Sequence, residues 1–355
     1  MNKSNIYSKG KEGDNIMRII ATLGPSINEK LVIQELISSG ANTFRFNFSH
    51  GTIEDFDAKY KLIKNINKNI HIMVDLPGSK IRISDKLPYI YKVYNGEKLL
   101  FCGEDVYINK GYIVKNDREK VIPLNIQNIF LKDKNIRNIS MKDNTMNFEI
   151  LSIDDNGIKV KVKRGGIIRA GKGVNIKGFS RENLKLSEKD KIAISWGIKN
   201  KADIICQSFV EDLFDIEKVK NFIKLNNTEE NYMPKIWGKL ETKKGVKNVS
   251  IISKSVDGIV IGRGDLIPES NIIDVPIYQD KIFNDLKSYK GEVIVATHIL
   301  NSMKIGKRAD LSEVDSIYNL ILKGCNGFLL SGETSIGKAP IKTIKFLVSL
   351  IKKYK

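Results

Sequence analysis

The sequence predicts an α/β fold: a (β/α)8 barrel with a small all-β lid domain inserted after the third strand. Two observations lead to this prediction. Short runs rich in β-branched residues alternate eight times with longer amphipathic stretches, which is the pattern of repeated βα units. The 99 residues from 80 to 178 break this rhythm, and without them the chain of 355 residues retains 256, close to the roughly 250 typical of such barrels.

The repeated units set the expected elements of the barrel, which is assigned to residues 1–79 and 179–355. Strands are expected at residues 18–23, 43–48, 70–75, 204–209, 235–240, 258–261, 293–296 and 327–330. Helices are expected at residues 29–38, 54–67, 188–199, 213–225, 246–254, 278–288, 311–322 and 341–353. Thr52 and Ser187 are suitable N-caps, and Pro340 suits the first turn of the last helix.

The inserted segment, residues 80–178, is predicted to be a separate β domain. A strictly alternating run at 158–164 follows residues 150–153 across Asn156 and Gly157, which predicts an antiparallel hairpin. The segment holds 20 Lys and Arg against 11 Asp and Glu, a net charge of +9. Half of the whole chain's surplus of +18 therefore lies in this domain.

Composition excludes several classes of protein. No apolar run approaches the 18 residues of a membrane span and the N-terminus lacks the apolar core of a signal peptide, so a soluble, cytoplasmic protein is expected. Cys102, Cys206 and Cys325 are far apart, which favours buried, reduced thiols over a disulfide or a zinc site. The positive charge suits either a phosphate-rich partner or a Lys-rich composition, and no stripe of Arg and aromatic residues indicates a specific nucleic acid.

The carboxyl ends of the predicted strands carry the candidate functional residues, because this end of such a barrel is where reactive groups gather. Nearly all of these ends are polar. They are Gly24 with Pro25, Asn47 to His50, Asp75, Ser208, Lys239 with Glu241, Arg263 with Asp265, Thr297 with His298, and Ser331 with Glu333. A full ring of polar strand ends is hard to explain by stability alone.

Glu241 and Asp265 follow adjacent predicted strands, where two carboxylates can share one Mg²⁺ and leave its other positions to water and substrate. Lys239 lies two residues before Glu241, so both side chains point to the same side of the strand. A divalent ion beside an ammonium group, with Arg45 on the same ring, suits a phosphoryl or carboxylate substrate. The alternative is that these acids are helix caps or solvated charges.

Two strand-to-helix turns fit a phosphate-binding role and a purely structural role equally well. Residues 21–26 and 330–334 can each present backbone N–H groups to a phosphate, and each also fits a simple turn with a cap.

Taken together, these segments resemble the pyruvate kinase family, over nearly the whole chain from Ile19 to the last helix. The matching segments are ATLGPS (21–26), RFNFSHG (45–51), DLPGSKIR (75–82), KGVNI (172–176) with LSEKD (186–190), KIWGKLE (235–241), DGIVIGRGDL (257–266), ATHILNSM (296–303) and LSGETSIG (330–337). Eight ordered matches at strand ends make the resemblance independent of any single motif.

The resemblance implies a glycolytic kinase that transfers the phosphoryl group of phosphoenolpyruvate to ADP, using Mg²⁺ or Mn²⁺. Lys239 and Arg45 would bind the phosphoryl group in flight, and Glu241 and Asp265 the divalent ion. Thr297 and Ser331 match residues of the enolate proton relay. The implied substrate-binding set is Arg45, Ser208, Lys239, Gly264, Asp265 and Thr297.

The resemblance also implies a nucleotide site and a monovalent-cation site. The nucleotide-binding positions are Pro25, Asn47, His50, Arg82 and Lys172, the last of them in the lid. The cation ligands are Asn47, Ser49 and Asp75. Lys80 stands where potassium-dependent members carry glutamate, so its ammonium group is expected to replace K⁺, and K⁺ is not expected to be required.

The sequence departs from the family at several points. It ends after the eighth helix, so a truncated member without the C-terminal regulatory domain is expected, with no response to sugar phosphates and with any homo-oligomer formed through the barrel. Pro268 lies in an altered loop at 266–276 and is expected to reshape the substrate's acid-binding end. His298 and Glu211 stand where glutamine and a basic residue are usual, and residues 142–144 only partly match an acidic turn.

These departures leave alternatives to a short pyruvate kinase. One is a related phosphotransferase that acts on a different phosphorylated carboxylic acid or acceptor. Another is a non-catalytic, ligand-binding regulatory protein. A third, a pyruvate-forming aldolase or lyase on the same barrel, would not need nucleotide-side residues such as Arg82 and Lys172.

Overall fold

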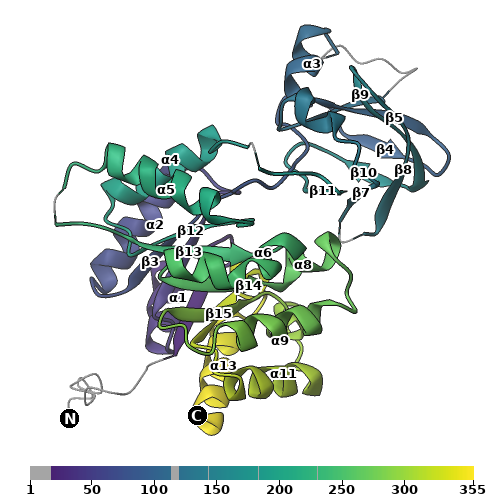
Figure 1. Ribbon diagram of the computed structural model, residues 1–355. Helices are drawn as coiled ribbons and strands as arrows, with labels where there is room; N and C mark the ends of the chain where they lie inside the picture. The colour runs from purple at the N-terminus through teal and green to yellow at the C-terminus, as the bar shows by residue number, and fades with distance from the viewer. Residues whose placement is uncertain (1–16, 113–119, 143, 183, 230) are drawn as a thin grey trace, which may run out of the picture.

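A computed structural model describes residues 17–112, 120–142, 144–182, 184–229 and 231–355, and it contains the predicted closed barrel (Figure 1). Eight parallel strands are hydrogen-bonded in the order β1-β16-β15-β14-β13-β12-β3-β2. Their bounds are β1 Arg18–Thr22, β2 Thr43–Asn47, β3 His71–Asp75, β12 Ile204–Gln207, β13 Lys235–Leu240, β14 Gly258–Gly262, β15 Glu292–Ala296 and β16 Gly327–Leu330. Each strand starts and ends within two residues of its predicted bounds.

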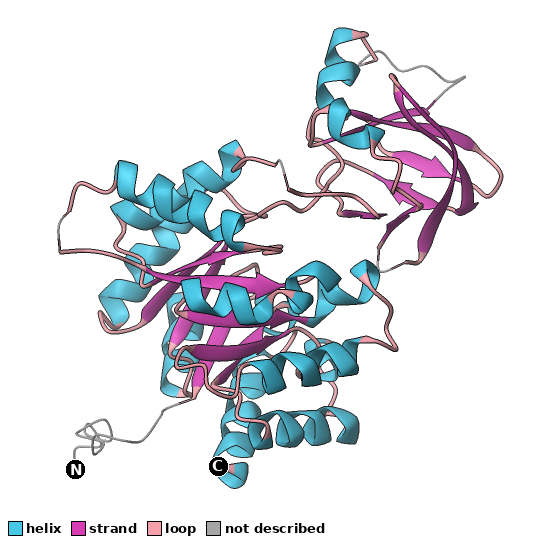
Figure 2. Ribbon diagram, viewed as in Figure 1, coloured by secondary structure: helices cyan, strands magenta, loops and turns pink. Residues whose placement is uncertain are grey.

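Helices cover the outside of the barrel (Figure 2). The longer ones are α1 Lys30–Ser38, α2 Ile53–Ile66, α4 Glu188–Lys199, α5 Leu213–Asn226, α9 Val275–Asp285, α11 Leu311–Leu322 and α13 Pro340–Tyr354. Short helices are α6 Lys243–Lys247, α7 Val249–Ile252, α8 Arg263–Glu269, α10 Asn301–Lys304 and α12 Gly332–Ser335. The expected caps form, because the side chains of Thr52 and Ser187 each accept a hydrogen bond from the backbone three residues on.

Two predicted helices differ from the structure. The single helix expected at 246–254 is divided into α6, α7 and a 3-10 turn at Ser253–Ser255. The break falls at Asn248, whose side-chain amide donates to the carbonyl oxygen of Glu211 at 2.8 Å and whose backbone leaves the helical region. The helix expected at 278–288 begins earlier, at Val275, because Pro276 occupies its first turn.

The segment between β3 and α4 forms two antiparallel or mixed sheets of its own, drawn at the upper right of Figure 1. The six-stranded sheet has the order β11-β7-β8-β9-β5-β6, and β10 pairs with β4. Their bounds are β4 Tyr91–Val93, β5 Lys98–Gly103, β6 Lys120–Leu124, β7 Asn138–Met141, β8 Met146–Asp154, β9 Gly157–Arg164, β10 Gly166–Ile168 and β11 Val174–Lys177. The predicted hairpin is confirmed as β8 and β9. A short helix, α3 Glu104–Asn109, lies between β5 and β6, and a 3-10 helix at Asn128–Lys132 lies between β6 and β7.

Three clusters of buried apolar side chains form the cores of the barrel and the lid. One fills the space between the barrel strands and their helices, one lies within the lid, and a small one fills the barrel interior around Trp237. The indole of Trp237 is fully buried against Gly258 on the next strand, where a Cβ atom would come within 2.5 Å of Nε1. The buried position of the Trp237 indole therefore requires a residue without a side chain at position 258.

The structure also describes the three cysteines and the length of the helices. Cys102, Cys206 and Cys325 are buried free thiols, as the sequence predicts. Within the described part of the chain, none of the helices has the length and apolar character needed to cross a membrane.

Candidate active site

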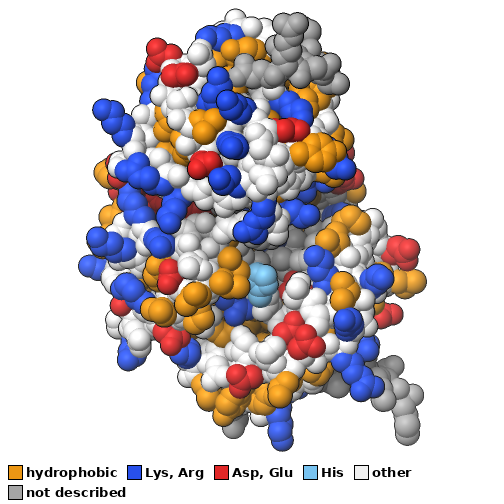
Figure 3. Space-filling view, turned by 90° about the vertical axis from the view of Figure 1, so that its right-hand side faces the viewer, with side chains coloured by type: hydrophobic (Ala, Val, Ile, Leu, Met, Phe, Trp, Pro, Cys, Tyr) orange, Lys and Arg blue, Asp and Glu red, His pale blue; other side chains and the backbone are white. Residues whose placement is uncertain are grey.

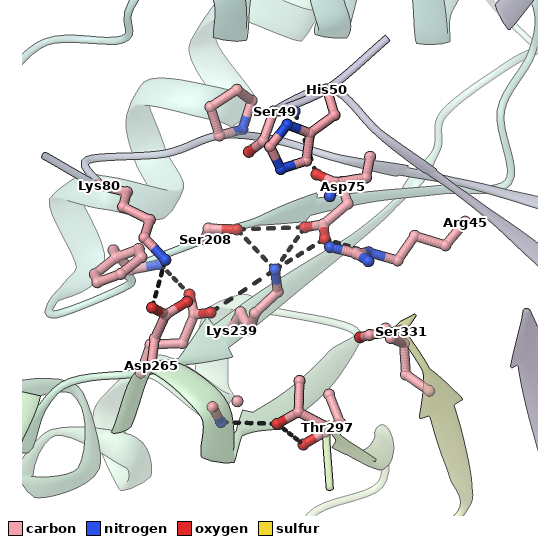
Figure 4. Close-up of a pocket in the computed structure, with 18 of the residues that line it drawn as sticks. Arg45, Ser49, His50, Asp75, Lys80, Ser208, Lys239, Asp265, Thr297 and Ser331 are labelled. Atoms are coloured by element: carbon pink, nitrogen blue, oxygen red, sulfur yellow. Dashed lines mark hydrogen bonds and ion pairs between the residues drawn. The ribbon is translucent and has the colours of Figure 1, made fainter. Parts of the chain in front are cut away.

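A pocket of about 200 Å³ opens at the carboxyl ends of the barrel strands (Figure 4). It brings together fourteen of the sequence-predicted site residues: Arg45, Asn47, Ser49, His50, Asp75, Lys80, Arg82, Ser208, Lys239, Glu241, Gly264, Asp265, Thr297 and Ser331. Pro25 and Lys172 do not line it, and both are exposed. Figure 3 shows Lys and Arg side chains gathered around the hollow between the lid and the barrel.

The centre of the pocket wall is the carboxylate of Asp75, which is 1% exposed at the end of β3. Lys239 Nζ lies 2.8 Å from Asp75 Oδ1 and 2.9 Å from Oδ2, and Arg45 Nε donates to Oδ2. Burial alone would raise the pKa of Asp75, but the charges of Arg45 and Lys239 outweigh burial and lower the pKa. Asp75 is therefore an anion shared by two cations.

Strand order explains why these three groups meet. Arg45 lies on β2, Asp75 on β3 and Lys239 on β13, and β12 separates the last two strands. Ser208, just past the end of β12, bridges this gap: its Oγ accepts from Lys239 Nζ at 2.8 Å and donates to Asp75 Oδ1 at 3.3 Å. Burial would lower the pKa of Lys239, and the Asp75 carboxylate raises it instead, so the ammonium group stays charged.

Glu241 and Asp265 form a second, acidic part of the pocket. Glu241 directly follows β13, two residues after Lys239, and Lys239 Nζ lies 3.9 Å from Glu241 Oε1. The backbone N–H of Phe209 donates to Glu241 Oε2 at 2.9 Å. Burial raises the pKa of Glu241 to about 7, with Lys239 opposing and the neighbouring Asp265 adding to the shift. Glu241 thus has a preference for added positive charge, and two carboxylates crowded together in this way fit a divalent cation.

Lys80 lies against the acidic part of the pocket. Its ammonium group forms an ion pair with Asp265 and lies 5.6 Å from the ring centroid of Phe209. Burial acts to raise the pKa of Asp265, but the ion pair with Lys80 outweighs it and lowers the pKa. Asn47 Oδ1 meanwhile accepts the backbone N–H of Ser49 at 3.2 Å, within the loop after β2.

Thr297 stands in a strained turn at the end of β15. Its φ is +65° and that of His298 is +52°, a region that residues with a Cβ rarely adopt. The Thr297 hydroxyl accepts the backbone N–H of Gly264 at 2.7 Å and donates to the carbonyl oxygen of Ala296 at 2.6 Å. This contact ties the turn to the first residues of α8.

Arg263 fixes the other side of this turn, a contact that the sequence analysis did not anticipate. Its Nη2 donates to the carbonyl oxygens of Thr297 and His298, each at 2.7 Å. Burial lowers the pKa of this guanidinium to about 10, with Glu333 opposing. The sequence showed Arg263 only as one more polar residue at a strand end, since its partners are main-chain atoms 34 and 35 residues away.

Pro268 lies inside α8, in its last turn. The first residues of α8, which carry Gly264 and Asp265, are helical despite it. The start of α8 therefore forms with Pro268 in place, while Pro268 has no N–H to donate to the carbonyl oxygen four residues back, which is that of Gly264.

The side of the pocket nearest the lid carries a positive field. Burial and the charges of Arg82, Arg45, Lys80 and Lys172 all lower the pKa of His50, so the imidazole is neutral among cations. Arg82, itself near the start of the inserted segment, donates from Nη1 to the carbonyl oxygen of Gly171 in the same segment at 3.1 Å. Its buried Nε has no hydrogen-bond partner among the residues that the structure describes. This cationic side of the pocket suits an anionic ligand.

The comparisons with known proteins all indicate the same family. Residues 15–344 match the family described as "Pyruvate kinase, barrel domain". The pyruvate kinase of Thermotoga maritima is 31% identical over 339 residues, covering 94% of this chain and 70% of the relative. Those of Encephalitozoon cuniculi and Kluyveromyces lactis are 27% and 32% identical over 94% of this chain, covering 74% and 66% of their own lengths.

The contact between Thr297 and Gly264 leads to a prediction about stability. Thr297→Ala removes the acceptor of the Gly264 N–H, and it should lower the free energy of unfolding by about 1–2 kcal/mol. Thr297→Ser keeps the hydroxyl and removes the branching methyl group from a strained position, so its stability should equal or exceed that of the unmutated protein. Urea unfolding followed by circular dichroism measures both variants, and equal losses in the two would contradict the role of the hydroxyl.

Proposed function

The chain belongs to the pyruvate kinase family, and on that premise we propose that it transfers the phosphoryl group of phosphoenolpyruvate to ADP, giving pyruvate and ATP. The observation that carries this proposal is the buried Lys239 ammonium group. It shares the Asp75 carboxylate with Arg45, and the carboxylates of Glu241 and Asp265 line the same pocket. Phosphoryl transfer depends mainly on such fixed charge around the moving group.

Lys239 and Arg45 would hold the phosphoryl group. Both already share the carboxylate of Asp75, so their positive charge is fixed in place before substrate arrives and needs little reorganisation during the reaction. Ser208, which bonds to both Lys239 and Asp75, keeps the ammonium group in this position. We assign Ser208 to the substrate-binding set for this reason.

A divalent cation is required throughout this family, and here Glu241 and Asp265 would bind it. We propose Mg²⁺ or Mn²⁺, since oxygen ligands suit both ions. When bound, the ion neutralises charge on the oxygen atoms of the substrate. Lys80 supplies positive charge to Asp265 from the protein itself.

The enolate left by phosphoryl transfer takes a proton, and we assign Thr297 and Ser331 to that end of the pocket. Thr297 lines the pocket with its hydroxyl held between Gly264 and Ala296. Gly264 would bind the acid group of the substrate together with Thr297. Ser331 lies at the end of the neighbouring strand β16.

The lid, for which we propose residues 80–178, would close over the nucleotide. His50 and Arg82 lie on the pocket wall, Asn47 beside them, and Pro25 and Lys172 outside it. Closure would bring Lys172 to the phosphates and exclude water from the reaction. We further propose a cytoplasmic enzyme, with the barrel as the surface for any homo-oligomer.

A direct assay tests the proposal: purified protein is incubated with Mg²⁺, ADP and phosphoenolpyruvate, and pyruvate is measured. Formation of pyruvate and ATP in equal amounts is expected. A panel of other phosphorylated carboxylic acids tests the alternative substrate class, and faster turnover of another acid would overturn the assignment of phosphoenolpyruvate. The intact first turn of α8 gives no structural reason to favour such an acid.

We predict that Lys239→Met and Asp265→Ala each lower the turnover number by roughly 100-fold or more, because each removes fixed charge from the reacting group or its metal ion. Lys191→Met is a matched control on the exposed face of α4, where Lys191 pairs only with Glu188 among the described contacts. Circular dichroism shows whether the variants are folded, and near-normal turnover in a folded Lys239→Met or Asp265→Ala protein would exclude this site.

A further prediction concerns potassium dependence. The Lys80 ammonium group already lies in the pocket, so activity without sodium and potassium should equal activity with KCl, with tetramethylammonium chloride matching the ionic strength. Lys80→Glu would place a carboxylate beside Asp265 and should create a potassium requirement. Strong potassium dependence of the unmutated protein would make Lys80 an ordinary pocket lysine.

A further inference from the structure

Arg181 lies in the linker that returns the chain from lid strand β11 to helix α4, and its side chain is only 4% exposed. Its Nη2 donates to Glu269 Oε1 at 2.9 Å, and its Nη1 donates to Glu211 Oε1 at 3.3 Å. Glu269 Oε1 also accepts from the side chain of Asn175, on β11, at 3.0 Å. The lid, the linker, α8 and the loop after β12 therefore meet at the Arg181 guanidinium and the Glu269 carboxylate that pairs with it.

Aromatic contacts extend this junction toward the pocket. The guanidinium carbon of Arg181 lies 5.1 Å from the ring centroid of Phe209 and 5.8 Å from that of Phe179. Such distances give a favourable cation–π contact, which is stronger where water is excluded. Phe209 has a left-handed backbone, with φ at +56°, so neighbouring contacts must hold its conformation.

Both elements that Arg181 contacts carry or hold a carboxylate of the proposed metal site. Glu269 is the last residue of α8, and Asp265 is one turn earlier on the same helix. Phe209 holds Glu241 through its backbone N–H, and its ring also faces the Lys80 ammonium group. One buried cation thus braces Asp265 through α8 and Glu241 through Phe209.

We propose that Arg181 is a positioning residue that sets the spacing of Glu241 and Asp265 and couples this spacing to the lid through Asn175. The inference rests on the proposed function, because it takes these two carboxylates as the ligands of the divalent ion. Groups that orient metal ligands without touching the metal typically change its affinity by about 10- to 100-fold when they are removed.

The junction also explains a departure from the family. Glu211 stands where a basic residue is usual, and its carboxylate faces Arg181. A basic residue at 211 would place two cations together in a buried site, so Arg181 requires an acid there. In this chain, the positive charge at this junction thus comes from Arg181 in the linker and not from residue 211.

The test measures Mn²⁺ binding to the substrate-free protein, by the electron paramagnetic resonance signal of free Mn²⁺. Arg181→Met should raise the dissociation constant of Mn²⁺ by about tenfold or more, and Arg181→Lys, which keeps the charge without the fork, should recover part of the affinity. Lys244→Met is the matched control, because Lys244 pairs with Glu182 in the same linker and with Asp212. Its Mn²⁺ affinity should be unchanged.

Thermal unfolding of each variant separates positioning from stability. A folded Arg181→Met protein with unchanged Mn²⁺ affinity would overturn the proposal, as would an equal loss of affinity in Lys244→Met. If Arg181→Met does not fold, Glu269→Gln decides, since it weakens the same junction with an isosteric side chain. It should weaken Mn²⁺ binding, and unchanged affinity would overturn the proposal. Because no substrate is present, failure to form pyruvate in the wild type would refute the proposed function without obscuring this result.

Discussion

The buried carboxylate of Asp75 is the group on which the pocket depends. An isolated anion at this depth would be costly, and Arg45 and Lys239 together compensate for its burial. The same interaction holds both cations at the carboxyl ends of β2 and β13, where they line the pocket. The Asp75 carboxylate therefore holds two positive charges at the place where a phosphoryl group would need them.

The rest of the pocket is arranged around this group by contacts from different strands. Ser208 links Lys239 to Asp75, Phe209 holds Glu241, and Thr297 is tied to the start of α8. The turns at Phe209 and at Thr297 both have positive φ, so two of the turns at the functional end of the barrel are strained. Arg263 and Arg181, each buried, provide the hydrogen bonds that oppose this strain or brace the elements next to it.

Much of this arrangement is predictable from the sequence, because strands of a closed barrel bring their carboxyl ends together and side chains two apart on a strand face the same way. Lys239 and Glu241 met in the pocket for that reason. The break at Asn248 was not predictable, since it depends on a hydrogen bond to a distant carbonyl. The partner of Lys80 was not either, because Asp265 lies 185 residues away. Arg181 belongs to no motif, and only its burial among Glu211, Glu269 and Phe209 distinguishes it from other basic residues of the chain.

The most direct test of the central role of Asp75 is the turnover number of Asp75→Asn for pyruvate formation, with circular dichroism to establish the fold. Asparagine keeps the shape of the side chain and removes the charge that holds Lys239 and Arg45. We expect a folded barrel whose turnover number falls by about 100-fold or more. A folded Asp75→Asn protein with the turnover number of the unmutated protein would contradict the central role of Asp75.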